Sequence, residues 1–311
     1  MLKQILESGT LVGEGMDLEI QKLSQDHIDF FLSLKDKPLV FDHNILKALI
    51  NPEIKIIKKK FRTDKKSVQD VINRYNDRYN VLKEELMKKS ELRNLVSISA
   101  LTTSEKVSVI GMWDGKYLED QTGRVELSLP IAGTNVLVIN NEVVGITGEK
   151  KDNKFLVQEI IYPDVVAKPL KKSEKLAKVF IGKSIPEGEV CKVNYAIIQE
   201  EQKLSERVAT VELNGYGEFE IGGIRFLVVR ESLENINKEI NKEGNLSEVN
   251  VCKEILKRRN LFYKDMWIKA VPDVFVSFSK ETFVDNYKGI TVIGVGNAPI
   301  LLDLQTREWT I

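Results

Sequence analysis

Histidine and cysteine are scarce in this chain of 311 residues. It has two histidines, His27 and His43, and two cysteines, Cys191 and Cys252, with no CxxC pair. Nucleophilic triads need an imidazole beside the nucleophile, and hydrolytic metal centres rely on imidazole ligands. The sequence therefore predicts a protein that is not an enzyme, with no metal site and no cofactor, in a reducing intracellular compartment.

Long apolar runs and an excess of charge of one sign are also missing. No stretch approaches the roughly 18 apolar residues of a membrane span, and residues 1–15 lack the apolar core of a signal peptide. The 46 basic residues equal the 46 acidic ones, which excludes a globally basic nucleic-acid coat. We expect about two domains and no membrane contact.

The first third of the chain has helical spacing. Residues 1–66 are predicted as a short helical N-terminal region in which Ser24 is a helix N-cap. Its basic end, residues 55–66, is interpreted as a solvated linker in preference to a phosphate contact or nuclear import signal. Residues 67–91 are predicted as a connecting helix, because Ser67 and Asp70 form a capping-box pattern. Apolar residues and tyrosines recur along one face of that helix, which predicts packing against the next domain.

The rest of the chain predicts an α+β, multidomain protein. Residues 92–165 hold short β-branched runs separated by small turns, which favours a closed OB-fold β-barrel. Residues 176–311 mix strands with two helices, in 231–242 and 247–260, which favours a layered α/β domain. Trp267 and Trp309 are expected in its core.

The order of these motifs resembles the B-subunit family of DNA polymerase epsilon. The matching stretches begin with a helix, VINRYNDRYNVLKEELMKKSEL (71–92), and continue with VIGMWDGKYLEDQTGRVELSL (109–129) and NVLVINNEVVGITGEKKDNKFLVQEIIYPD (135–164). Further segments are IRFLVVRESL (224–233), VCKEILKRRNLF (251–262), VPDVFVSFSKETF (271–283) and GITVIGVGNAPILLDL (289–304). Each is short, so the resemblance rests on their order across residues 60–311.

The resemblance implies an accessory subunit with a reduced, inactive calcineurin-like phosphoesterase domain at residues 176–311. Residues 183–186 and 296–299 stand where active relatives keep metal ligands, and they contain no aspartate or histidine. The implied partner is the C-terminal zinc-binding domain of the catalytic subunit of polymerase epsilon, in the nucleus. The N-terminal region would contact the replicative helicase through the GINS complex, and contact with DNA would be weak or indirect. The residues proposed to bind a partner are Trp113, Tyr117, Lys150, Lys151 and Tyr162.

Three alternatives remain. The chain is a B-subunit of polymerase delta or alpha, which share the two-domain plan. Or it binds single-stranded nucleic acid on the barrel, where Lys116, Lys150, Lys151 and Lys154 accompany Tyr117 and Phe155. An active metallophosphoesterase is the least favoured, because its ligands would have to come from Asp273, Asp285, Asn297 and Asp303 without histidine.

Overall fold

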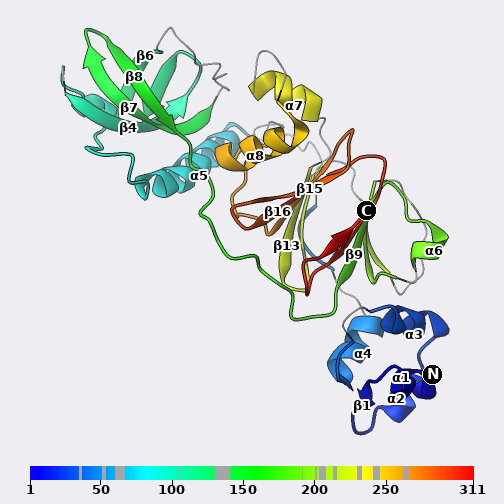
Figure 1. Cartoon of the computed structure of the whole chain (residues 1–311). Helices are drawn as coiled ribbons and strands as arrows, with labels where there is room; N and C mark the ends of the chain where they lie inside the picture. Colours follow the sequence, from blue (N-terminus) through cyan, green and yellow to red (C-terminus); the bar gives the residue numbers. More distant parts are fainter. Residues whose placement is uncertain are drawn as a thin grey trace. The chain divides into compact units, whose positions relative to one another are not determined.

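The chain folds into two compact units, each assembled from separate stretches of sequence (Figure 1). The first unit contains residues 1–60, 168–231 and 272–311, and the second contains residues 61–167 and 232–271. No helix in the ranges below is long and apolar enough to cross a membrane. The computed structural model describes residues 1–34, 37–50, 54–59, 67–103, 105–129, 141–190, 192–199, 202, 208–212, 216–229, 233–240, 246–261 and 266–311.

Short helices packed on one another form the N-terminal part of the first unit. They are α1 (Leu2–Glu7), α2 (Asp17–Gln21), α3 (Gln25–Leu32) and α4 (His43–Ile50), with a parallel pair β1 (Leu11–Val12) and β2 (Val40–Phe41). Phe31 and Phe41 meet edge to face with their ring centres 5.0 Å apart in the core. The predicted cap is confirmed, because Ser24 and the His27 side chain form a reciprocal capping box at the start of α3.

Two sheets share the main core of the first unit. One has the order β15-β16-β14-β13-β12-β3 and the other β11-β10-β9-β17-β18. Buried residues of both sheets belong to one apolar cluster, for example Ile197, Phe226 and Ile293. The strands are β3 (Ile54–Lys59), β9 (Lys178–Gly182), β10 (Tyr195–Ile198), β11 (Ala209–Glu212), β12 (Tyr216–Ile221), β13 (Ile224–Val229), β14 (Val274–Phe278), β15 (Phe283–Tyr287), β16 (Ile290–Val295), β17 (Ile300–Asp303) and β18 (Trp309–Thr310); a short helix, α6, spans Glu187–Val190.

Part of the basic segment interpreted as a solvated linker is instead a strand. β3 pairs antiparallel with β12, with Ile54 opposite Ile221 and Lys55 opposite Glu220. It is the edge strand of its sheet, where the exposed Lys55 discourages further pairing. The remainder of that segment, residues 60–66, lies outside the described residues.

The second unit is built around a closed ring of five strands. These are β4 (Lys106–Trp113), β5 (Tyr117–Asp120), β6 (Gly123–Ser128), β7 (Glu142–Lys151) and β8 (Lys154–Ile161), in the order β4-β5-β6-β8-β7. The ring closes because β7 also pairs with β4, and β6 with β8 is its one parallel pair. Short strands were predicted across residues 92–165, and these five lie there; the β-branched run NVLVIN at 135–140 lies outside the described residues.

In the described part of the chain, three helices belong to this unit. The helix predicted at residues 67–91 is present as α5 (Val68–Met87), four residues shorter at its end, and its Ser67 and Asp70 cap each other. Its Tyr79 and Leu82 pack with Ile110 of β4, and burial raises the pKa of Tyr79 to about 12. The other helices are α7 (Leu233–Ile240) and α8 (Glu248–Arg258), and a 3₁₀ turn, η1, spans Ile98–Ala100. The helices α7 and α8 were expected in the layered α/β domain, and they belong to the unit that contains the ring.

Candidate functional site

The carboxyl ends of the parallel strands form the edge where α/β proteins usually bind their ligands. In the first unit, β9, β10 and β11 run parallel, and so do β13, β14 and β16. Lys183 and Ser184 follow β9, Gln199 follows β10, and Asn297 lies two residues after β16. These side chains are amides, a hydroxyl and an ammonium.

Local hydrogen bonds hold the loops at this edge. The Gln202 side chain accepts from the backbone N–H of Ile185 and donates to its carbonyl, both at 2.9 Å. The Thr282 hydroxyl accepts from the N–H groups of Gly296 and Ala298. Across the described ranges, no group of three or more His, Cys, Asp or Glu residues is arranged to hold a metal ion. Both histidines lie in the N-terminal helices.

The four polar residues considered as metal ligands do not come together at this edge. Asp273 precedes β14, whereas Asn297 follows the parallel strand β16, so they lie at opposite ends of one sheet. Asp285 lies within β15. Asp303 ends β17, where its carboxylate accepts from the backbone N–H groups of Gln305 and Thr306.

The Asp273 carboxylate has a structural environment of its own. It is buried, accepts a hydrogen bond from Lys168 Nζ, and accepts another from the backbone N–H of Arg225 at 3.0 Å. Burial on its own raises the pKa of Asp273, but the hydrogen bonds from Lys168 and Arg225 outweigh it, so the net pKa is lowered. The ionised form is therefore favoured by folding.

Replacing Asp273 by asparagine is expected to lower the free energy of unfolding by about 1–3 kcal/mol at pH 7, because Lys168 loses its buried partner. A carboxyl with a lowered folded-state pKa stabilises above its unfolded-state pKa of about 4, and this stabilisation disappears as the pH falls through the folded-state value. Urea unfolding of both proteins at pH 7 and pH 3 measures this. The difference between them must shrink at pH 3, and a constant difference contradicts the assignment.

The ring carries all five residues proposed to bind a partner, in different settings. Trp113 is fully buried in the ring core. Tyr162 is 9% exposed, and Arg258 lies 4.6 Å from the centre of its ring. Burial raises the pKa of the Tyr162 hydroxyl, against the lowering effect of the Arg258 charge. Neither aromatic ring is presented at the surface.

Tyr117 lies between two cations, in a row where Glu126 also pairs with Lys116 at 3.9 Å and with Lys154 at 3.0 Å. Lys116 Nζ and Arg124 Cζ are each 4.9 Å from the centre of its half-buried ring. Strand register places Tyr117 opposite Glu126, Glu126 opposite Lys154, and Lys154 opposite Lys151. Tyr117 and Lys151 thus share one row of residues across four strands.

Lys150 and Lys151, the other two residues predicted to bind a partner, differ in solvent exposure and hydrogen bonding. Lys151 is exposed. Lys150 is half-buried and its Nζ donates to the carbonyl of Leu101 at 3.3 Å. Sequence reasoning did not single out Arg124 or Glu126, although both occur in the GRVELS strand beside the Lys116–Tyr117 turn.

Comparison with known proteins gives one similarity that bears on function. No family model matches the chain. Over 116 residues the chain is 33% identical to a protein named DNA polymerase II small subunit from Methanothermobacter thermautotrophicus. The matched part covers 32% of this chain and 24% of that protein. Over about a third of its length, the chain is thus similar to a DNA polymerase small subunit.

Proposed function

We propose that the chain is a non-catalytic accessory subunit of a DNA polymerase and acts by holding the catalytic subunit. The observation that carries this proposal is the similarity to a DNA polymerase small subunit. The more specific form is the B-subunit of polymerase epsilon in nuclear replication, which rests on the resemblance of residues 60–311 in motif order. Polymerase delta or alpha is the alternative within the same class.

The architecture supports the proposal in two places. The ring order β4-β5-β6-β8-β7, with its one parallel pair between the third and fifth strands, is the order of an OB-fold. The two sheets around one core, with parallel strands in each, are consistent with a phosphoesterase-like domain. The expected B-subunit combines these two parts.

The non-catalytic part of the proposal is supported by the chemistry at the strand ends. A two-metal phosphoesterase needs carboxylate and imidazole ligands that converge on the metals. Lys183, Ser184 and Asn297 occupy the described positions after β9 and β16. Hydrolysis of a generic phosphoester with added manganese by the purified chain would overturn this part.

The surface around Tyr117 is the favoured contact with the partner. An amphipathic ring flanked by Lys116 and Arg124 combines apolar area with charge, as interface anchors do. Lys151 lies on the same row of the ring. Trp113 and Tyr162 are assigned to the interior, since both are buried.

Co-expression with the C-terminal zinc-binding domains of the epsilon, delta and alpha catalytic subunits tests the proposal. Size-exclusion chromatography in about 0.3 M salt screens surface electrostatics. We expect co-elution with the epsilon domain, and Tyr117→Ala should weaken it. Tyr287→Ala, a half-buried tyrosine of the first unit, is the matched control and should leave it unchanged. Failure of the folded chain with all three domains rejects the proposal.

A single-stranded nucleic-acid binder is the second candidate. The observation that favours it is again Tyr117 between two cations, because bases stack on aromatic rings within basic grooves. If the chain has this function, it binds a single-stranded oligonucleotide at physiological salt, and the Tyr117→Ala variant does not.

A further inference from the structure

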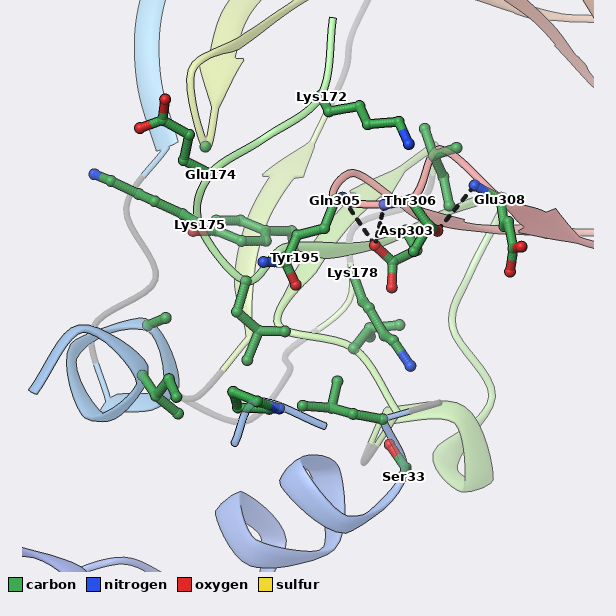
Figure 2. A pocket seen from close by; sticks show the side chains of 18 of the residues that line it. Ser33, Lys172, Glu174, Lys175, Lys178, Tyr195, Asp303, Gln305, Thr306 and Glu308 are labelled. Carbon is green, nitrogen blue, oxygen red and sulfur yellow. Dashed lines mark hydrogen bonds between the residues drawn. The ribbon is translucent and has the colours of Figure 1, made fainter. Parts of the chain in front are cut away.

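A large cavity lies in the first unit, between the N-terminal helices and the strands of the five-stranded sheet. Its volume is about 1420 Å³. Lys178 begins β9 and Asp303 ends the antiparallel neighbour β17, so the cavity adjoins the amino ends of the parallel strands. The polymerase-subunit proposal assigns no role to this edge of the sheet. Figure 2 shows Lys178 extending from its strand toward the segment that contains Ser33.

The lining of the cavity is basic although the chain as a whole is neutral. It contains seven basic side chains against four acidic ones, whereas the chain has 46 of each. The basic ones are Lys37, Lys47, Lys172, Lys175, Lys178, Lys192 and Arg307, and the acidic ones are Asp42, Glu174, Asp303 and Glu308. A locally positive concave surface concentrates anions from solution.

Several of these lysines have no ion pair within the described ranges. No carboxylate lies within 4 Å of the Nζ atom of Lys47, Lys172, Lys175 or Lys178 in that part of the chain. Two of the four acidic side chains of the lining already accept hydrogen bonds. Asp42 accepts from backbone N–H groups at the start of α4, and Asp303 accepts from backbone N–H groups after β17. The ammonium groups are thus available to an incoming anion.

Two cations of the lining are in addition partly desolvated. Burial and the nearby charge of Lys37 lower the pKa of Lys178, against the opposing effect of Asp303. Arg307 is 7% exposed, and its Nη2 donates to the Asp273 carbonyl. Its buried Nε and Nη1 have no hydrogen-bond partner among the described residues. An anion in the cavity would offset the cost of burying these charges.

The aromatic lining and the volume of the cavity restrict the chemical class of the ligand further. Trp309 on the edge strand β18 lines the cavity and is 44% exposed, whereas it was expected in the core. Indole faces stack on nucleic-acid bases with little sequence preference. The cavity also exceeds the roughly 300–1,000 Å³ of sites that hold one small molecule. An extended anion with flat rings fits these features better than a single phosphate.

We propose that this cavity binds a short segment of single-stranded nucleic acid, with its phosphates on the unpaired lysines and one base on Trp309. The phosphates contact Lys172, Lys175 and Lys178, which come from the linker before β9 and from β9 itself. The site is separate from the ring surface around Tyr117. It would be present whether or not the chain assembles with a polymerase.

Fluorescence anisotropy of a labelled dT15 oligonucleotide with the full chain tests the proposal, first at 50 mM and then at increasing salt. The double variant Lys175→Gln/Lys178→Gln should bind about tenfold more weakly, with a salt slope lower by about 1.4, since each single-strand phosphate contact contributes about 0.7. The matched control is Lys3→Gln/Lys238→Gln, which removes two exposed lysines outside the cavity and should change affinity less than about twofold.

Tryptophan fluorescence gives an independent measure of where the oligonucleotide binds. Binding should quench the wild-type signal, and Trp309→Phe should remove that quenching, because the other two tryptophans, Trp113 and Trp267, belong to the second unit. If Lys175→Gln/Lys178→Gln and Lys3→Gln/Lys238→Gln lose affinity for the oligonucleotide equally, binding is non-specific charge attraction and the proposal is overturned. If Tyr117→Ala loses oligonucleotide binding, the proposal is overturned and the binding site is the ring surface around Tyr117. Equal displacement by a decaglutamate peptide and by unlabelled dT15 overturns it in favour of an acidic polypeptide ligand.

Discussion

Replacing Glu142 by alanine is expected to lower the free energy of unfolding of the second unit by about 3–5 kcal/mol. Glu142 Oε2 accepts a hydrogen bond from Arg258 Nη1 at 3.0 Å, and the two side chains are 2% and 4% exposed. Although burial lowers the pKa of Arg258, Glu142 and Glu254 raise it, and the net pKa is raised. The variant leaves the buried Arg258 guanidinium with Glu254, at 3.0 Å from Nε and more exposed than Glu142, as its remaining counter-charge.

Urea unfolding followed by tryptophan fluorescence measures this effect. In a Trp309→Phe background the two remaining tryptophans, Trp113 and Trp267, both belong to the second unit. Lys238→Ala is the control, because it breaks the exposed Glu234–Lys238 pair of α7 and should cost about 0.3–0.5 kcal/mol. Glu142→Leu/Arg258→Met should recover most of the stability, since an apolar pair replaces a buried ion pair at little cost. Equal costs for the two single alanine variants contradict the prediction.

Replacing Trp113 by alanine is expected to cost about 3–5 kcal/mol of unfolding free energy, because a fully buried indole leaves a cavity that the ring cannot close. The same change in an exposed interface anchor would reduce binding and leave stability almost unchanged. Tyr117→Ala gives that contrast, since Tyr117 is half-buried at the edge of the ring.

Hydrogen exchange of the β4, β7 and β8 amides in the unbound chain distinguishes the two roles of Trp113. We expect faster exchange throughout these strands in Trp113→Ala and little change in Tyr117→Ala. Unchanged protection together with lost co-elution would instead make Trp113 part of the interface, as the sequence interpretation first placed it.

Helix and strand assignments that depend on neighbours in sequence agree with the structure. The Ser67–Asp70 capping box starts α5, and the alternating run KVSVIGMW is β4 at Lys106–Trp113. These signals are local, because a cap satisfies amides three residues away and a strand pattern repeats every two residues. The strands β10 and β15 were not predicted.

Assignments that depend on distant partners did not follow from the pattern. The basic run containing Lys55 reads as solvated, but it pairs with β12, which lies more than 150 residues later in the chain. Arg258 was expected in a basic helix end, and its buried guanidinium donates to Glu142, which lies 116 residues away in the chain. Trp309 reads as core, yet it lies on an edge strand and is exposed.

Among the residues of the candidate sites, some were likewise recognisable from the sequence alone and others only from the fold. Residue types alone indicated the scarcity of ligands for hydrolytic metals, since the chain has two histidines, His27 and His43, and none after position 43. Adjacent residues also identified Tyr117 with Lys116. The convergence of Lys37, Lys47, Lys172, Lys175 and Lys178 on one cavity required the fold, because the first two lie more than 120 positions before the other three in a chain whose charges sum to zero. Electrostatic attraction depends on distances in space, and composition carries no information about them.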